Sequence, residues 1–330
     1  MNHPLQLDRR DFLAASAAAG AGLLAAGPAQ AAPFKTKLYK SMTLGAPTEA
    51  LLQSHKEAGF DGMETNAWGV SPDKAAKARE MAEKIGMKLH CVLYGWADFD
   101  APDAAVVAKY VDNVQTALRA CEGYGASALL LVPCQAPPVK NDQIPKPWDF
   151  DIEFDEATGH VTRVVKGDNS PYAAYIKAQN LATDASRRVI EEKLIPVAEK
   201  TGVVIALENV WNHLWVKPKL FAHFVASFKN RWVKAYFDIG NHVRYAMPEE
   251  WIRALGKLTV KYHVKDFKLD PTHTNPQGGS FVHPREGSIN WPLVREEIDK
   301  TGYNDFLTIE DGGLSLAEFS KRLDLIIAGK

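Results

Sequence analysis

Cysteine is scarce in this chain, and so is net charge. The 330 residues include three cysteines, Cys91, Cys121 and Cys134, which are scattered along the sequence. Their number and spacing exclude a disulfide framework and a CxxC metal site, although one pair could still form and the sequence does not say which. Lysine and arginine total 39 against 40 aspartates and glutamates, so the formal net charge is −1. The chain therefore lacks the basic excess of a nucleic-acid-binding protein.

The first 32 residues do not read as part of a folded domain. Paired arginines, Arg9 and Arg10, precede a weakly hydrophobic run of Ala, Gly and Leu, and Ala29-Gln30-Ala31 has the small residues of a cleavage site. This pattern resembles a twin-arginine export signal. An uncleaved membrane anchor is the alternative, but a run so rich in Ala and Gly inserts poorly. We therefore expect a periplasmic or otherwise extracytoplasmic protein without stable membrane association after cleavage.

Strand-like and helix-like segments alternate through the rest of the chain, residues 33–330. A closed (β/α)₈ barrel, or TIM barrel, is the α/β fold that this alternation favours. An open doubly wound sheet is the runner-up, and no GxGxxG motif follows the first strand to support it. The expected strands are Lys37–Leu44, Gly62–Asn66, Lys88–Tyr94, Ala128–Pro133, Val203–Glu208, Val233–Asp238, Val260–Asp266 and Phe306–Glu310. The expected helices include Thr48–Ala58, Ala75–Ile85, Ala104–Tyr124, Ala173–Lys200 and Ser315–Ala328.

One stretch, about residues 134–172, interrupts this alternation. It is rich in Pro and Asn at both flanks and contains two β-like runs, Trp148–Phe154 and His160–Lys166. We expect a β-hairpin inserted after strand four. A lid, a dimer contact and a plain surface excursion are all compatible with it.

Four expected strands end in a residue that can hold a metal. In chain order these residues are Glu208, Asp238, His263 and Glu310. Because the carboxyl ends of parallel strands meet at one face of a barrel, the four side chains should lie close together. Three oxygen ligands and one imidazole suit Mn²⁺ best, with Mg²⁺, Co²⁺ or Zn²⁺ as alternatives. A single such residue is usually an ordinary hydrogen-bonded group, but four on separate βα units favour a divalent-metal site.

Further residues near these strand ends could contact a substrate. Lys265 lies two positions after His263 and should point to the same side of the strand, unless it pairs with Asp266 at the surface. Aromatic rings pack on the apolar faces of sugars, which makes several tryptophans near the strand ends candidates, although core packing is the simpler reading for any one of them. The candidate substrate-binding residues are Glu64, His90, Asn212, Asn241, His242, Lys265, Trp68 and Trp96.

The sequence around the four strand ends resembles the xylose-isomerase-like TIM-barrel superfamily, in its sugar phosphate isomerase and epimerase group. The motifs that carry the resemblance are ALENVWN, YFDIGNH, YHVKD and GYNDFLTIE. The resemblance implies one divalent ion held by Glu208, Asp238, His263 and Glu310, with the two glutamates as the acid and base that move a proton. Ketose 3-epimerases of this group have a His and an Arg where this chain has Asn241 and Leu269, although His242 could substitute.

The resemblance implies an isomerase or epimerase acting on a small carbohydrate. In such an enzyme the metal polarises a carbonyl so that a carboxylate can remove the neighbouring proton. Export and the lack of a Lys/Arg phosphate clamp argue for an unphosphorylated sugar or sugar derivative. A lyase that eliminates the aglycone of a 3-keto-glycoside could use the same site. A non-catalytic sugar-binding protein and an apurinic endonuclease are less favoured, and a homo-oligomer remains open.

Overall fold

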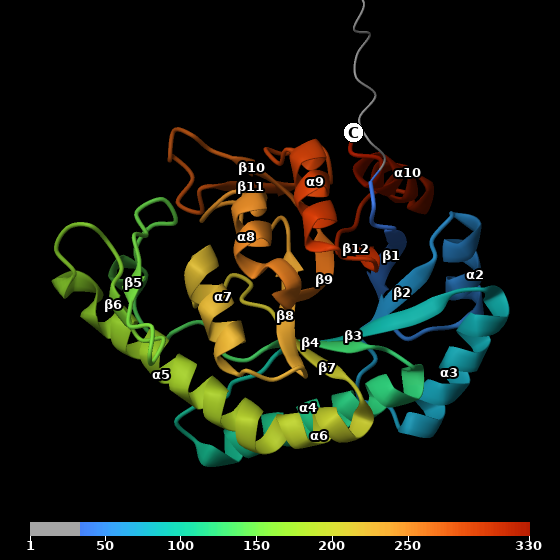
Figure 1. Cartoon of the computed structure of the whole chain (residues 1–330), viewed down its shortest axis with the longest axis horizontal. Helices are drawn as coiled ribbons and strands as arrows, with labels where there is room; N and C mark the ends of the chain where they lie inside the picture. Colours follow the sequence, from blue (N-terminus) through green and yellow to red (C-terminus); the bar gives the residue numbers. More distant parts are fainter. Residues whose placement is uncertain (1–33) are drawn as a thin grey trace, which may run out of the picture. The chain divides into compact units, whose positions relative to one another are not determined.

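Eight parallel strands close into a barrel (Figure 1). The structure is a computed structural model, and it describes residues 34–330. The export signal expected over residues 1–32 lies outside the described residues. Around the barrel the strand order is β1, β12, β9, β8, β7, β4, β3 and β2, and β1 pairs in register with both β12 and β2. The predicted TIM barrel is confirmed, and the open sheet is excluded.

The strands match the expected ones to within a few residues, with two informative differences. The strand β3 extends two residues past its expected end, to Trp96, and its register shifts near Gly95. The strand β9 stops at Val264, because the chain from Asp266 onward pairs elsewhere. The barrel strands are β1 (Tyr39–Leu44), β2 (Gly62–Thr65), β3 (Lys88–Trp96), β4 (Ala128–Val132), β7 (Val204–Leu207), β8 (Val233–Asp238), β9 (Thr259–Val264) and β12 (Phe306–Ile309).

Helices cover the outside of the barrel (Figure 1). Several begin at side-chain caps such as Ser71 and Asp103, whose oxygens accept a hydrogen bond from a backbone N–H of the first turn. The helices are α2 (Glu49–Glu57), α3 (Pro72–Ile85), α4 (Ala104–Tyr124), α5 (Ala173–Val189), α6 (Ile195–Thr201), α7 (Pro218–Ser227), α8 (Pro248–Leu255), α9 (Trp291–Thr301) and α10 (Leu316–Ile327).

The single helix expected over Ala173–Lys200 is divided by a turn of π-helix at Ile190–Leu194. Pro196, in the first turn of α6, explains the break. Proline has no N–H to donate and its ring clashes with the carbonyl four residues earlier, so the backbone widens ahead of it.

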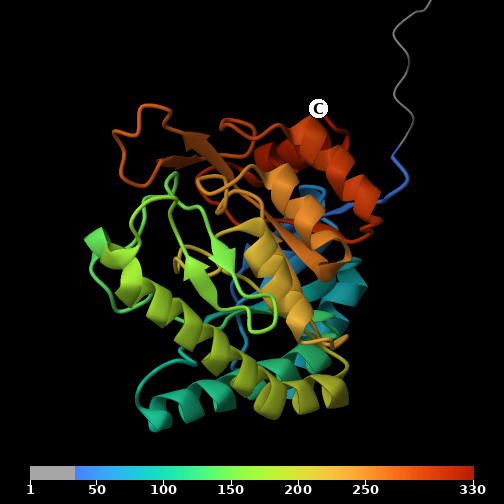
Figure 2. The ribbon, with the colours of Figure 1, turned by 60° about the vertical axis from the view of Figure 1, so that its left-hand side comes forward.

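Two short antiparallel ribbons lie outside the barrel sheet. Within the irregular stretch 134–172, β5 (Glu153–Phe154) pairs with β6 (Val161–Arg163), and both are much shorter than the expected runs. Figure 2 shows this ribbon beside α5, where Asn180 hydrogen bonds to the backbone of Val161. The second ribbon, β10 (Asp266–Leu269) with β11 (Gly279–Val282), directly follows β9 and was not expected from the sequence.

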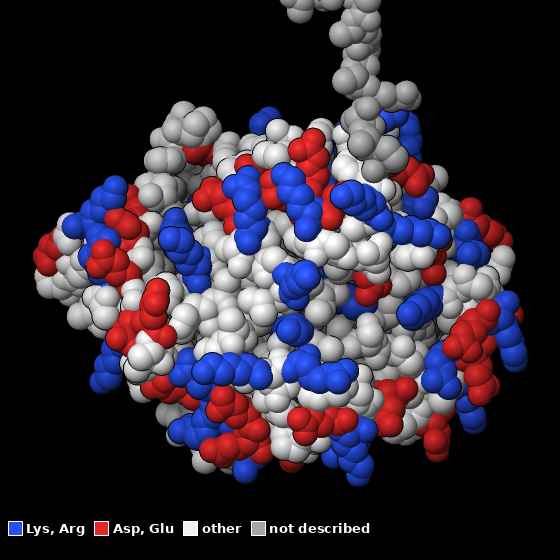
Figure 3. Space-filling model, viewed as in Figure 1, with Lys and Arg blue, Asp and Glu red and all other residues white. Residues whose placement is uncertain are grey.

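The core has an outer layer between strands and helices and a small inner layer within the barrel. The inner layer includes Cys91, Leu130 and Tyr236. All three cysteines are buried and free, so none of them pairs. Over the described residues, no helix is both long and apolar enough to span a membrane. Figure 3 shows acidic and basic side chains on the same face, in keeping with a net charge of −1.

Candidate metal centre and active site

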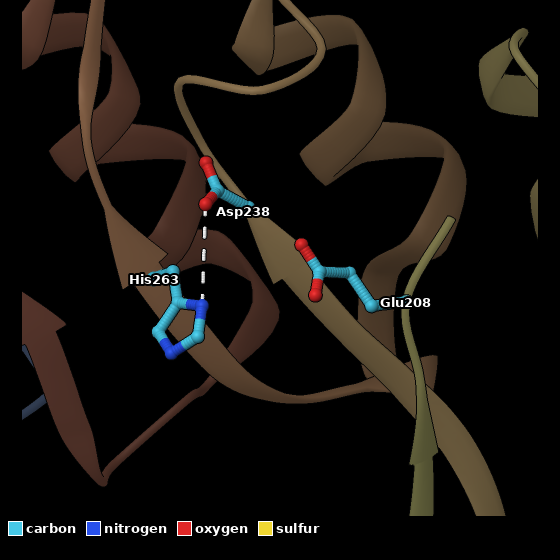
Figure 4. Close-up of side chains that lie close together, drawn as sticks. All are labelled: Glu208, Asp238 and His263. Atoms are coloured by element: carbon cyan, nitrogen blue, oxygen red, sulfur yellow. Dashed lines mark ion pairs between the residues drawn. The ribbon is translucent and has the colours of Figure 1, made fainter. Parts of the chain in front are cut away.

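Glu208, Asp238 and His263 converge at the carboxyl end of the barrel (Figure 4). Glu208 follows β7, Asp238 ends β8 and His263 is near the end of β9, and these three strands are neighbours in the sheet. One ligand atom from each of the three lies within 4.8 Å of the others, and all three side chains are buried. The fourth expected ligand, Glu310, follows the next strand, β12, but it is outside this mutual distance.

Glu310 joins the cluster through His263. Its Oε2 atom lies 2.8 Å from His263 Nδ1, and its side chain keeps 31% of its surface exposed. It is therefore the ligand candidate nearest to solvent. The structure thus gives three closely grouped candidate ligands and a fourth at the rim, where a carboxylate can meet a substrate.

The two nitrogens of His263 have different surroundings. Nε2 lies 2.7 Å from Glu64 Oε1, and both of these side chains are fully buried. Nδ1 faces the cluster, 3.9 Å from Asp238 Oδ2. When Nε2 donates its proton to Glu64, the lone pair on Nδ1 of a neutral ring points at the three carboxylates, which is the orientation a metal ligand needs.

Unsatisfied buried atoms show that this donor set fits a cation. Asp238 Oδ1 accepts hydrogen bonds from the backbone N–H groups of Gly240 and Asn241, both at 2.8 Å. Asp238 Oδ2 and His263 Nδ1, in contrast, are buried and form no hydrogen bond of good geometry, and their close polar neighbours are the charged groups Lys265 Nζ, 3.2 Å from Asp238 Oδ2, and Glu310 Oε2, 2.8 Å from His263 Nδ1. Buried polar atoms are normally paired, and these two face one another across the cluster. One imidazole and several carboxylates form a ligand set suited to Mn²⁺, Mg²⁺ or Zn²⁺.

Lys265 places a positive charge in the same cluster. Its Nζ atom lies 2.7 Å from Glu310 Oε2 and 3.2 Å from Asp238 Oδ2. The alternative partner, Asp266, is instead bonded to Trp291 Nε1 and to the backbone of Arg285. Lys265 therefore lies on the same side as His263, as the strand alternation predicts, and neutralises part of the carboxylate charge.

The two glutamates have opposite electrostatic surroundings. Burial, together with the charges of Glu310 and Asp238, raises the pKa of Glu208 to about 8. Burial would also raise the pKa of Glu310, but His263 and Lys265 outweigh it and hold that pKa well below its usual range. Two carboxyl groups whose pKa values are pushed apart can act as an acid and a base in one site.

Glu64 is not placed to bind a substrate, contrary to the expectation from the sequence. Its Oε1 accepts from Thr43 at 2.8 Å, and its Oε2 accepts from the Tyr236 hydroxyl at 2.9 Å. With His263 as a third partner and no exposed surface, the carboxylate is fully engaged inside the barrel. The strand alternation that relates His263 to Lys265 also relates Tyr236 to Asp238, two residues later, so Tyr236 could have been found by the same rule.

The prediction that His90 lies at the end of its strand and binds a substrate is also wrong. It is the third residue of β3, not its end, because that strand continues to Trp96. Its ring stacks on Phe306 at a centroid distance of 4.1 Å, and Nε2 lies 2.8 Å from Ser41 Oγ. Burial lowers its pKa well below the usual value. His90 is therefore a neutral core residue of the barrel.

The three candidates that follow β7 and β8 have different fates. Asn241 belongs to the site, since its Nδ2 donates to Glu208 Oε1 at 3.0 Å. Asn212 instead holds its loop, donating to the carbonyl of Cys134. His242 points away into the core, where its ring lies 4.7 Å from that of Trp251, so it does not substitute for the absent histidine at position 241.

A cavity of about 350 Å³ opens beside the cluster. Trp68 and Trp96 do not line it, and Trp68 instead packs edge-on against Tyr94 at 5.0 Å. Trp211 does line it, fixed by a 2.7 Å hydrogen bond from Nε1 to the carbonyl of Asn241. The lining residues are Val210, Trp211, Asn241, Lys265, Phe281, Val282, Glu310 and Asp311. Phe281 and Val282 come from the unexpected β10–β11 ribbon, so no strand-end pattern in the sequence marks them.

Comparison with known families agrees with this architecture. Residues 52–318 match the family described as xylose isomerase-like TIM barrel, which is most of the chain. The chain belongs to the xylose isomerase-like TIM barrel family. A curated relative of this chain, an uncharacterized protein of Methanocaldococcus jannaschii, is 25% identical to it over 137 residues. That alignment covers 40% of this chain and 44% of the relative, so the match spans less than half of either protein.

Several solved structures share the fold. The 3-keto-D-glucoside 4-epimerase of E. coli has a TM-score of 0.58 at 14% identity, covering 88% of this chain and 100% of that one. The IOLI protein with a bound zinc atom has a TM-score of 0.62 at 14% identity, covering 88% and 98%. Others include sugar 3-epimerases and a complex with magnesium. The family match and these structural neighbours support the assignment of the chain as an enzyme of the isomerase or epimerase kind.

Proposed function

We propose that this protein is a divalent-metal-dependent isomerase or epimerase of an unphosphorylated sugar or sugar derivative. The observation that carries the proposal is the pairing of Glu208 and Glu310 at one Asp238–His263 cluster, with their pKa values shifted in opposite directions. Glu208, Asp238, His263 and Glu310 would hold the ion. When bound, the ion supplies a Lewis acid that stabilises negative charge on a carbonyl oxygen.

The residues themselves divide the proton transfer. Glu310, ionised and partly exposed beside the cavity, removes the proton next to the substrate carbonyl. Glu208, oriented by Asn241 and with a pKa that burial and neighbouring carboxylates raise, is the second proton carrier and returns a proton to the substrate. Return to the same carbon from the other face gives epimerisation, and return to the neighbouring carbon gives isomerisation. Lys265 offers its ammonium to a substrate oxygen, since it already lies at the Glu310 carboxylate.

A second candidate is elimination from a 3-keto-glycoside at the same site. The specific observation in its favour is the apolar wall of the cavity, where the Trp211 and Phe281 rings lie 5.0 Å apart. An apolar aglycone would pack there next to Glu310. The same base would remove the proton, and the aglycone would leave with the bonding electrons of its carbon–oxygen bond.

Two further features complete the proposal. We place the protein in the periplasm or outside the cytoplasm, because of the twin-arginine pattern at Arg9 and Arg10. Mn²⁺ is the preferred ion, because a carboxylate-rich ligand set with one imidazole suits it, and Mg²⁺, Co²⁺ and Zn²⁺ are the alternatives.

The test is proton NMR of sugars in D₂O with the Mg²⁺-loaded protein. Deuterium entering next to the carbonyl of a free ketose, with the carbon skeleton kept, supports an isomerase or epimerase. Release of the aglycone from a 3-keto-glucoside supports the lyase. Glu310→Gln should abolish either reaction while Glu318→Gln, a glutamate on α10 paired with Arg322, leaves it intact. Neither exchange nor elimination with any of these sugars, in protein shown to hold metal, would refute both enzymatic proposals in favour of a binding protein.

A further inference from the structure

Arg244 is a buried cation without an acidic partner. Its side chain is 9% exposed, and among the described residues it forms no ion pair with a carboxylate. Its Nε atom is buried with no hydrogen-bond partner. Buried arginines are normally paired with an anion, because a charge taken out of water loses hydration free energy that an anion or several hydrogen bonds restore. An anionic ligand would supply the partner that this side chain lacks.

Aromatic rings hold the guanidinium in one place. Its central carbon lies 4.1 Å from the centroid of the Trp211 ring and 4.9 Å from that of Tyr245. Trp211 is itself fixed by its hydrogen bond to Asn241, and Tyr245 is buried. Stacking fixes the plane of the guanidinium but leaves its N–H donors at the edge free for a planar anion. The group is thus pre-organised for bidentate recognition.

A second cavity opens at this guanidinium. It has a volume of about 260 Å³, and besides Arg244 its lining combines polar side chains, including Asn141, Lys146 and Gln277, with apolar ones such as Ile144 and Trp211. No acidic residue lines it. The segments around it come from the irregular stretch 134–172 and from the loop between β10 and β11. These two segments are joined by the Trp148 and His273 rings, which stack at 4.1 Å.

Trp211 connects this second cavity to the reaction site. The same ring lines both cavities, and the residue that anchors it, Asn241, also hydrogen bonds to Glu208. A ligand that extends past Trp211 would have one end near Glu310 and the other near Arg244. The aromatic ring between them suits the apolar face of a sugar ring.

We propose that the cavity at Arg244 is a subsite for the carboxylate of an acidic sugar unit, so that the natural substrate is a uronate-containing saccharide or glycoside. This inference rests on the proposed function for the substrate class, but it concerns binding and not turnover. Arg244 forms two hydrogen bonds to the carboxylate, Lys146 adds a second positive charge at the entrance, and Trp211 packs against the sugar ring.

Binding can be measured without catalysis. Isothermal titration calorimetry with glucuronate, glucose and inorganic sulfate should show glucuronate binding about tenfold or more tighter than glucose, because a hydrogen-bonded charge contributes more than a neutral group. Arg244→Gln should remove this preference. Arg231→Gln is the matched control, since Arg231 also stacks on a tryptophan, Trp232, at 4.7 Å but is exposed. Equal binding of glucuronate and glucose by the wild type would overturn the proposal.

Two other outcomes are decisive. Sulfate that displaces glucuronate at equal concentration would show a general anion site and overturn the assignment to a sugar acid. Thermal unfolding of Arg244→Met without ligand separates binding from structure. A subsite arginine is expected to leave the midpoint unchanged or raised, since a buried unpaired charge is removed. A clear loss of stability would make Arg244 a structural residue. Proton exchange into free ketoses tests the catalytic proposal independently of all these results.

Discussion

His263 and Glu64 form a fully buried pair, with Nε2 of the imidazole 2.7 Å from Oε1 of the carboxylate. The contact spans the barrel interior, because the two residues come from β9 and β2, which are not neighbours in the sheet. Thr43 and Tyr236 donate two further hydrogen bonds to the Glu64 carboxylate. Glu64 therefore sets the orientation of His263 and not the position of a substrate.

The first prediction concerns this pair. Glu64→Gln should weaken metal binding about 10- to 100-fold, as is usual when the partner that orients a ligating histidine is changed. Tyr236→Phe, which removes only one hydrogen bond to Glu64, should have a smaller effect. Calorimetric titration with Mn²⁺ measures both variants. A Glu64→Gln protein that binds Mn²⁺ like the wild type, while its circular dichroism is unchanged, would show that the pair has no part in metal binding.

The second prediction is that metal binding releases protons and strengthens as the pH rises. Burial would lower the pKa of His263, but Glu310 and Glu64 raise it well above its usual value, and Glu208 has a pKa of about 8. Both groups thus carry protons near neutral pH in the metal-free protein and must lose them to act as ligands. Titrations in buffers of different ionisation enthalpy should count about two protons at pH 7 and fewer at pH 9. A proton count of zero at both pH values would contradict these ionisation states.

The third prediction concerns Lys265 as an internal cation. Lys265→Met leaves Asp238 and Glu310 without their positive partner, and should lower the free energy of unfolding of the metal-free protein by about 2 kcal/mol. Added Mn²⁺ should then raise the unfolding midpoint more in the variant than in the wild type. Lys268→Met, which changes an exposed lysine of β10 three residues later, is the control. Equal stability of the two variants without metal would show that the Lys265 contacts contribute little.

The fourth prediction is a loss of stability in mild acid caused by His242. Burial lowers the pKa of this histidine from 6.5 to about 4, so the unfolded chain binds a proton more readily than the folded one between these values. The contribution of His242 to the free energy of unfolding is fully present above pH 6.5 and is lost as the pH falls to 4. The loss amounts to about 3 kcal/mol in total. Urea unfolding at several pH values measures the slope.

His242→Asn should flatten this pH dependence, because asparagine keeps an N–H donor for the Asp238 carbonyl without titrating. His273→Asn, which changes an exposed histidine, should leave the slope as it is in the wild type. If the slopes of His242→Asn and wild type coincide between pH 4 and 6.5, the acid sensitivity comes from other groups.

Hydrophobic patterning was enough to predict the barrel. Buried parallel strands read as short apolar runs, and β8 begins and ends where that pattern does, at Val233 and Asp238. The four strand-end residues could be found for the same reason, since parallel strands bring their carboxyl ends to one face. The β10–β11 ribbon could not be predicted, because apolar and polar residues alternate without a break from Val260 to Lys265 and no turn residue marks the point at Lys265 where the chain leaves the barrel sheet.

The sequence by itself determined the fold and the residues at the mouth of the barrel, because both follow from local periodicity. Only the tertiary structure decided what each polar residue does, because a side chain's role depends on partners that are distant in the sequence. In the sequence, Glu64 and His90 look like ligands at the end of a strand. In the structure both side chains are buried in the barrel, where Glu64 contacts His263 and His90 stacks on Phe306. No sequence pattern marks Arg244, and its proposed role in binding follows only from the rings and the cavity that the fold assembles around it.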